Sequence, residues 1–338
     1  MDDGVVHVAV GNFGDYFTAW LRSRKPFVTA GTYLDYETHA KNRLLPTFAA
    51  MRLDKLTRAD VREWLVECDE SGQYSPKTIN NALAVLVTCL NQAAEDRLIA
   101  VNPAAGIQRL PEGHVERDYL RIEEIDRYLE ASSEVYRPLA ELLVTCGLRI
   151  SEALGLIWAD VDFDHQVIVV YRQAKAQRGE TGGTKSQRFR RVEAGPDLFK
   201  RLADLNATRA EMVAGDIGSQ AVFVMPVRVG KHDRGCYAGS GDGEVMNRNT
   251  VSRDWHKETL ANACIRDLPL HGLRHTAAAS WLYAGQPLIY VQRQLGHSSI
   301  TTTERYYGHL EQGFLKTAAK DTEAAIRAAG QRATERLG

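Results

Sequence analysis

The sequence predicts a mainly α-helical protein with a small β-sheet inserted among the helices of its second half. Three observations predict this class. Apolar residues recur at helical spacing from residue 13 to about residue 107. Farther along, β-branched and alternating residues flank the glycine-containing stretch AQRGETGGTK, and helical spacing then returns. Because 338 residues exceed the usual size of one domain, we expect an all-α bundle followed by an α+β domain.

The first region contains four helical stretches, two of which have clear start signals. The stretches are FGDYFTAWLRSRK, TAGTYLDYETHAKNRLLPTFAAM, TRADVREWLVECDES and SPKTINNALAVLVTCLNQAAEDRLI. Thr57 and Ser75 stand where helix caps belong, Asp60 lies early in the helix after Thr57, and Pro76 occupies a first-turn position. This pattern predicts a helical domain over residues 1–107.

A change in composition separates this domain from the rest of the chain. The stretch VNPAAGIQRLPEGHVER contains two prolines and has no apolar periodicity, so we expect a linker over residues 108–117 and a second domain over residues 118–338. In that domain the predicted helices are RIEEIDRYLEAS, EVYRPLAELLVTC, ISEALGLIW and DLFKRLADLNATRAEMV, and the predicted strands lie in VDFDHQVIVVYRQAK and SQRFRRVEA. Residues 227–249 are glycine-rich, which predicts a flexible loop.

Composition narrows the possible partners. Lys and Arg number 42 against 43 Asp and Glu, so a nucleic-acid partner requires a local basic surface. No apolar run approaches the roughly 18 residues of a membrane span, so we expect a cytoplasmic protein with no membrane partner. The five cysteines form no CxxC pair, which favours reduced, buried thiols over disulfides or zinc ligands.

Two segments of the second domain carry basic residues in unusual settings. In TCGLRISEALGLIW, Arg149 and Glu152 share a helix face, which fits either a surface ion pair or a functional pair. In GGTKSQRFRR, Lys185 stands at the mouth of a predicted hairpin. Three arginines follow it, namely Arg188, Arg190 and Arg191. Alternatively, the charged residues of this second segment only keep an exposed edge strand soluble.

Two further segments carry histidines. HGLRHTAAASWLYAG places His271, Arg274 and His275 on the opening turn of an apolar helix. Histidines four residues apart also occur in zinc helices, but the glutamate of a zinc protease is absent and Arg274 would repel a dication, so we expect no metal. A helix N-terminus with an arginine instead suits a phosphate group. In QLGHSSITTTERYYGHL, His297 precedes a Ser/Thr-rich turn, which also fits a simple helix cap.

In combination, these segments resemble the tyrosine recombinases, specifically the phage-type integrases. The resemblance rests on G-L-R-I-S-E-A-L, T-K in a hairpin, H-x-L-R-H-T, L-G-H-S-S-I and Y-G-H-L, which occur in the family's order between about residues 145 and 310. The helical domain before them resembles the family's core-site-binding domain. The N-terminal region looks too short for the arm-site-binding domain that many phage integrases carry.

The resemblance implies how these residues act on a scissile phosphate. Arg149 and Arg274 would clamp its non-bridging oxygens through their planar guanidinium groups. Lys185 would protonate the departing 5′ oxygen as a general acid. Because a free tyrosine hydroxyl has a pKa of about 10, the cations would also stabilise the developing phenolate.

The histidines and the glutamate complete the implied site. His271 would assist proton transfer from the tyrosine, and His297 would hydrogen-bond the phosphate. Glu152 and His275 would orient these groups. The resemblance implies that no cofactor, nucleotide or metal takes part.

The nucleophile is one of two adjacent tyrosines. Family members place it nine or ten residues after the histidine of L-G-H, positions that here are Tyr306 and Tyr307. The Y-G-H-L pattern favours Tyr307, whereas R-Y in TTERY favours Tyr306. Adjacent helical residues point about 100° apart, so only one of them can face the phosphate. We expect Tyr307 to be the nucleophile, with Tyr306 as the alternative.

The resemblance also implies partners and an assembly. We expect a C-shaped clamp on double-stranded DNA attachment sites and a homotetramer that exchanges strands through a Holliday junction. An accessory DNA-bending or directionality factor is a further expected partner. The implied setting is integration of a viral genome in a bacterial host cell, near the nucleoid. The tail FLKTAAKDTEAAIRAAGQRATERL is either a helix docked on a neighbouring protomer or a frayed terminus.

Other functions share part of this pattern. A Xer-like resolvase uses the same chemistry for another biological purpose. A type IB topoisomerase shares much of the catalytic chemistry but relaxes one duplex without exchanging partners. A DNA-binding protein with a decayed site would lack some of the catalytic residue types, all of which are present here.

Overall fold

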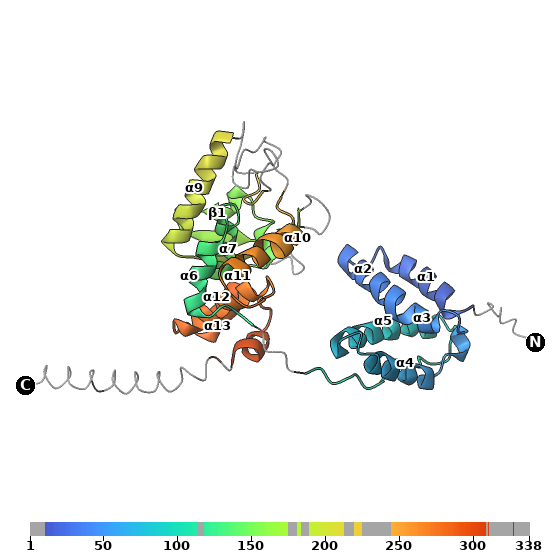
Figure 1. The fold of residues 1–338 in the computed structure, drawn as a ribbon. Helices are drawn as coiled ribbons and strands as arrows, with labels where there is room; N and C mark the ends of the chain where they lie inside the picture. The colour runs from blue at the N-terminus through green and yellow to red at the C-terminus, as the bar shows by residue number, and fades with distance from the viewer. Residues whose placement is uncertain are drawn as a thin grey trace, which may run out of the picture. The chain divides into compact units, whose positions relative to one another are not determined.

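A computed structural model describes residues 11–113, 118–174, 181–183, 189–212, 220–224, 245–308, 310 and 327. The chain divides into two compact units, Met1–Val115 and Glu116–Gly338. Figure 1 shows the first unit in blue to teal and the second in green to red. The described part of the first unit is helical, and the second combines helices with short strands, as the fold class predicted from the sequence requires.

The first unit is built from helices that begin at capping side chains. Its elements are α1 (Phe13–Arg24), α2 (Ala30–His39), the π-helix η1 (Ala40–Leu44), α3 (Leu45–Phe48), the 3₁₀ helix η2 (Leu53–Lys55), α4 (Arg58–Glu70) and α5 (Pro76–Glu95). Thr57 and Asp60 form a capping box at the start of α4. Ser75 caps α5, and Pro76 occupies its first turn. Both predicted helix starts are therefore confirmed.

An aromatic core holds the first unit together. Phe13, Phe17, Phe48 and Trp64 are nearly fully buried, and their rings lie in a chain of close contacts. Helix α5 contributes the largest share of the aliphatic side chains to this core, because its apolar residues recur every three to four positions.

Part of the segment expected to be a linker packs on α5. The amide of Asn80 donates to the Leu110 carbonyl oxygen, and its carbonyl accepts the Leu110 backbone N–H, both at 2.9 Å. Asn102 donates to the Val87 carbonyl oxygen at 3.0 Å. The chain therefore stays against the first unit through Leu110 before it passes to the second.

The second unit surrounds α7. Its elements are α6 (Ile122–Ala131), α7 (Arg137–Cys146), α8 (Ile150–Ala153), the 3₁₀ helix η3 (Trp158–Asp160), β1 (Val161–Asp162), β2 (Val167–Val170), β3 (Arg172–Ala174), β4 (Thr181–Gly183), β5 (Arg190–Glu193), α9 (Pro196–Met212), α10 (Arg248–Thr250), the π-helix η5 (Val251–Trp255), α11 (His256–Asn262), α12 (Gly272–Tyr283) and α13 (Leu288–Leu295). Residues 300–308 are also helical. Helix α7 packs against α6, α8, α9 and α12.

The strands form two small antiparallel sheets. The order of the first is β1-β2-β5, and the register pairs Val170 with Arg190. Strands β3 and β4 form the second. The predicted helix ISEALGLIW is wrong in its second half, because α8 ends at Ala153 and a 3₁₀ turn begins at Trp158. The loop predicted over 227–249 lies outside the described residues up to 244, and its end differs from the prediction because α10 begins at Arg248.

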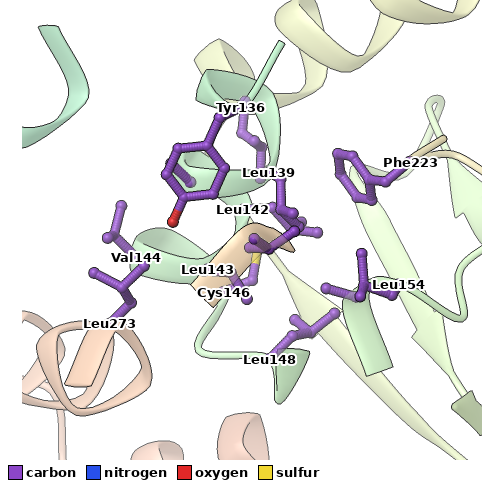
Figure 2. Close-up of a cluster of buried hydrophobic side chains, with 14 of the residues drawn as sticks. Tyr136, Leu139, Leu142, Leu143, Val144, Cys146, Leu148, Leu154, Phe223 and Leu273 are labelled. Atoms are coloured by element: carbon purple, nitrogen blue, oxygen red, sulfur yellow. The ribbon is translucent and has the colours of Figure 1, made fainter. Parts of the chain in front are cut away.

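The core of the second unit places α7 beside the segments that carry the predicted site. Figure 2 shows leucines of α7 packed with Phe223 on one side and with Leu273 of α12 on the other. In the same core, the Tyr128 hydroxyl contacts the Tyr136 hydroxyl at 2.7 Å and His256 Nδ1 at 2.6 Å. His256 Nε2 lies 2.7 Å from the Leu268 carbonyl oxygen, three residues before His271. This buried chain of hydrogen bonds anchors the segment that leads into α12.

Two other expectations concern the chain as a whole. Among the cysteines that the structure describes, Cys89 and Cys146 are free and buried, as predicted, whereas Cys68 is half-buried and Cys264 is exposed, so the prediction of buried thiols is wrong for Cys264. Among the helices that the structure describes, none combines the length and apolarity needed to cross a membrane. The C-terminal tail lies outside the described residues except for Arg327, which is helical.

Candidate active site

The turn between α7 and α8 carries Arg149 and Glu152. Helix α7 ends at Cys146, and the next residue, Gly147, has a φ of 58°, which lies in the left-handed region. Arg149 then caps α8, and Glu152 Oε2 accepts the Arg149 backbone N–H at 2.8 Å. The Arg149 guanidinium donates to Glu152 Oε1 at 2.8 Å. Because Glu152 is 2% exposed, the surface ion pair that the spacing allowed is excluded.

Replacing Gly147 with alanine should destabilise the second unit. A Cβ there would lie 2.9 Å from Leu295 Cδ2 and 3.0 Å from a ring carbon of Trp281, and the backbone conformation itself disfavours a side chain. Strain and overpacking together should lower the free energy of unfolding by about 2–4 kcal/mol. Gly285→Ala is the matched control, because Gly285 also has a positive φ but open space around it. Urea unfolding should show the larger loss for Gly147→Ala, and equal losses would contradict the packing described here.

Helix α12 brings Arg274 into the interior. Arg274 is 3% exposed, and its guanidinium donates to the Gly147 carbonyl oxygen at 2.5 Å and to the Leu295 carbonyl oxygen at 2.6 Å. These carbonyls lie at the ends of α7 and α13, where the helix dipoles favour a cation. Burial, followed by the charge of Arg149, lowers the pKa of Arg274. An arginine stays protonated near neutral pH even so, which leaves a positive charge in a poorly hydrated place.

The tyrosine that the sequence favours lies beside the same helix. Tyr307 is 2% exposed, and its hydroxyl lies 2.5 Å from His275 Nδ1. Tyr306, on the same helical segment over residues 300–308, is half-buried, and its ring lies farther from the His275 ring. His271 and His275 meet edge to face with ring centroids 5.0 Å apart. The two histidines of the opening turn of α12 and Tyr307 therefore form one cluster.

His297 follows α13 through another left-handed glycine. Gly296 has a φ of 69°, and His297 Nδ1 lies 2.9 Å from the Thr303 hydroxyl. Burial, together with the charges of Arg274, Arg149, Arg190 and His271, lowers the pKa of His297 to about 4. His297 is therefore neutral at pH 7 in the protein alone.

The low pKa of His297 predicts a pH dependence of stability. Between about pH 6.5 and pH 4 the unfolded chain binds a proton at this residue that the folded chain does not bind, so the free energy of unfolding should fall as the pH falls. Asparagine at position 297 should remove this part of the slope, because it does not titrate. Urea unfolding of wild type and His297→Asn at several pH values measures the difference. Parallel slopes, or an NMR titration of His297 with a midpoint near 6.5, would contradict the environment described.

An ion pair that sequence reasoning missed completes the cluster. Arg190 donates to Glu152 Oε1 at 3.0 Å and to Glu152 Oε2 at 2.7 Å. Burial raises the pKa of Glu152, but the hydrogen bonds and charge of Arg190, with the charges of Arg149 and Arg274, lower it to about 2. The interpretation of these arginines as a solvated strand edge is therefore wrong for Arg190, whose side chain is only 13% exposed.

The described part of the chain thus brings most of the predicted site residues together. The residues that converge are Arg149, Glu152, His271, Arg274, His275, His297 and Tyr307. Lys185 and Arg188 lie outside the described residues. In the ranges described, no three His, Cys, Asp or Glu side chains are grouped as metal ligands. The cluster combines a phenol, imidazoles and guanidinium groups, a set suited to a phosphate ester.

Comparison with protein families agrees with this chemistry. Residues 117–313 match the phage integrase family, and residues 12–67 match the N-terminal SAM-like domain of phage integrases. The integrase of Mycobacterium phage D29 is 27% identical over 320 residues, which cover 93% of this chain and 77% of that protein. A XerC-like tyrosine recombinase of Caldanaerobacter subterraneus is 25% identical over 88% of this chain and 79% of its own length.

Solved structures share the fold. The Tn1549 transposon integrase in complex with a circular intermediate DNA superposes with a TM-score of 0.71 at 21% identity, over 87% of this chain and 94% of that one. A lambda integrase tetramer bound to a Holliday junction has a TM-score of 0.67 at 16% identity, over 88% of this chain and 78% of that one. Since the family match covers more than half of the chain, the protein belongs to the phage integrase family, and it is a tyrosine recombinase that cleaves and rejoins DNA at specific sites.

Proposed function

We propose that Tyr307 attacks a DNA phosphate held by Arg149 and Arg274 and forms a 3′-phosphotyrosine. The observation that carries this proposal is the position of the Tyr307 hydroxyl, which is buried beside Arg274 and in contact with His275. In this place a positive charge acts with little screening by water, so it favours the phenolate that attack requires.

The step conserves the phosphodiester bond energy. The Tyr307 oxygen forms a bond to phosphorus as the bond from phosphorus to the 5′ oxygen breaks, and the tyrosine proton passes to a base. His275 is positioned to receive that proton from the resting phenol, and His271 lies against His275. Lys185 supplies a proton to the departing 5′ oxygen. The free 5′ hydroxyl then attacks the phosphotyrosine that a second protomer has formed on the partner strand and releases that protomer's tyrosine, and the reciprocal attack releases the first Tyr307.

His297 and Glu152 complete the proposed site. His297, neutral in the protein alone, hydrogen-bonds the phosphate, and the added negative charge raises its pKa when DNA binds. Glu152 holds Arg149 through both the backbone and the guanidinium group. Two carboxylate contacts to one arginine limit the rotations that would turn it from the phosphate.

The proposed partners are two DNA duplexes and further copies of this chain. The lambda integrase with the same fold has been captured as a tetramer on a Holliday junction. By analogy, four protomers clamp two attachment sites. Integration of a mobile genome, with an accessory DNA-bending or directionality factor, fits the similarity to phage integrases. Resolution of the Xer kind is a second candidate, favoured by the similarity to XerC-like recombinases.

Covalent trapping from a randomised pool tests the proposal and selects the attachment site in one step. A pool of nicked duplexes with randomised cores is incubated with the protein in EDTA, and DNA that becomes linked to protein is recovered and sequenced. A nick beside the scissile phosphate lets the short strand leave, so the phosphotyrosine accumulates. We expect a defined core sequence to be enriched.

Two labelled copies of the enriched site then test strand exchange. Holliday junctions that contain both labels are expected from a recombinase. Relaxation of one duplex without joint molecules would support a topoisomerase instead. The absence of any covalent adduct across the pool would overturn the proposed chemistry.

A further inference from the structure

Strand β5 carries two adjacent arginines that face in different directions. Successive residues of a strand point to opposite faces of the sheet. Val192 is fully buried and Arg190 points to the same side, whereas the side chain of Arg191 is exposed. One arginine of the pair is therefore directed into the protein by the strand itself.

The guanidinium group of Arg190 fits the carboxylate of Glu152 as a fork. Its two terminal nitrogens each donate to one oxygen of Glu152. The same two oxygens accept the backbone N–H and the guanidinium of Arg149. Glu152 is thus shared between two arginines, of which Arg190 is 13% exposed and Arg149 is 44% exposed. The buried Arg190 neutralises the Glu152 carboxylate, and the carboxylate in turn holds the more exposed Arg149 in place.

The same side chain reaches the turn that carries His297. Arg190 Nε donates to the Gln294 carbonyl oxygen at 2.9 Å, near the end of α13. The aliphatic part of Arg190 passes so close to Gly296 that a Cβ there would lie 2.8 Å from Arg190 Cδ. Gly296 directly precedes His297. Arg190 therefore contacts both the Arg149 turn and the His297 turn, which are far apart in sequence.

We propose that Arg190 is a positioning residue of the recombination reaction. Arg190 holds Glu152, and through Glu152 it fixes the position of Arg149 relative to the turn that carries His297. The inference rests on the proposed function, because it concerns the geometry around the scissile phosphate. Without Arg190, the Glu152 carboxylate lacks its buried partner and draws the Arg149 guanidinium inward. Arg149 then presents its donors to the phosphate less well, and a displacement of about 1 Å costs on the order of 10²-fold in rate.

Single-turnover cleavage of the enriched nicked duplex by the full chain tests this role. Arg190→Met should lower the rate of adduct formation by about 10²-fold at saturating DNA, while gel-shift affinity stays near that of wild type. Arg190→Lys should restore only part of the rate, because an ammonium group cannot form the fork. Arg191→Met is the matched control and should cleave at the wild-type rate. The inference would be overturned if Arg190→Met, or Arg190→Lys, cleaved as fast as the control variant Arg191→Met.

A pH profile separates positioning from general support of the fold. In Arg190→Met, Arg149 and Arg274 still lower the pKa of Glu152, but the hydrogen bonds and charge of Arg190 are gone. Burial should therefore raise the pKa of this carboxyl above its value in the wild type. The cleavage rate of this variant should therefore fall toward low pH more steeply than that of wild type. The added pH dependence should vanish in Glu152→Gln/Arg190→Met, which has no carboxylate to protonate. An added slope that persists in the double variant would contradict the role.

The double variant also covers the case in which Arg190→Met fails to fold. It removes the buried charge together with its partner, so it should fold and cleave slowly with no added pH dependence. Full wild-type activity of the double variant would overturn the inference. A wild-type protein that forms no adduct would instead overturn the proposed function, so the two failures are distinguishable.

Discussion

Tyr307→Phe should abolish covalent adduct formation, whereas Tyr306→Phe should retain it. Phenylalanine has no oxygen that can bond to phosphorus, so no adduct should be detected, a loss of at least about 10⁴-fold on the scale of other enzyme nucleophiles. The hydroxyl of Tyr307 contacts His275 in the buried cluster, and Tyr306 is half-buried on the adjacent position of the helix. The measurement is single-turnover trapping on a nicked duplex.

The neighbouring tyrosine supplies the control for this result. Both substitutions remove one hydroxyl and leave the ring, and Tyr307→Phe also removes the buried contact with His275, so urea unfolding of both variants accompanies the cleavage assay. DNA affinity by gel shift should be similar for the two variants. Adduct formation by Tyr307→Phe at the wild-type rate, with loss in Tyr306→Phe, would move the nucleophile by one residue and contradict the assignment made here.

Arg274→Lys should lower cleavage by about 10²- to 10³-fold, although it preserves the positive charge. The guanidinium of Arg274 bridges the carbonyl oxygens of Gly147 and Leu295 and lies near Tyr307. A lysine has one charged nitrogen on a flexible stem, so it cannot hold both carbonyls and face a phosphate at the same time. Rates at saturating DNA should fall much more than affinity, because the charge that attracts DNA remains.

A second lysine substitution shows whether this result is specific to the site. Arg293 lies on α13 outside the cluster, and Arg293→Lys should leave the cleavage rate unchanged. Urea unfolding of both variants separates loss of stability from loss of rate, since Arg274 is also a buried structural contact. Wild-type cleavage by a folded Arg274→Lys protein would contradict the need for a guanidinium fork.

The helices could be predicted from the sequence because the residues that start them lie within a few positions of one another. Thr57, Asp60, Ser75 and Pro76 determine two helix starts within a few residues of chain, and the spacing of apolar residues gives the buried faces. The short α8 was overestimated because apolar residues after Ala153 continue a helical pattern, although the chain turns there to bury Leu154 and Leu156 in the core.

The site was only partly accessible because burial depends on distant contacts. The motif order identified Arg149, Arg274 and His297, but nothing local shows that Glu152 is enclosed. Arg190 looked like one charge among several on a strand edge, and its burial arises from contacts with Glu152 and Gln294. The alternation of Arg190 with buried Val192 was the available signal, because it places both on the inner face.

The proposed mechanism requires that the phenol enclosed beside Arg274 and His275 is the group that attacks DNA. Peptide mass spectrometry of the trapped protein-DNA adduct tests it most directly, because digestion leaves the linked nucleotide on one residue. We expect a phosphotyrosine at Tyr307. A nucleotide linked to Tyr306, or to any residue outside this cluster, would contradict it.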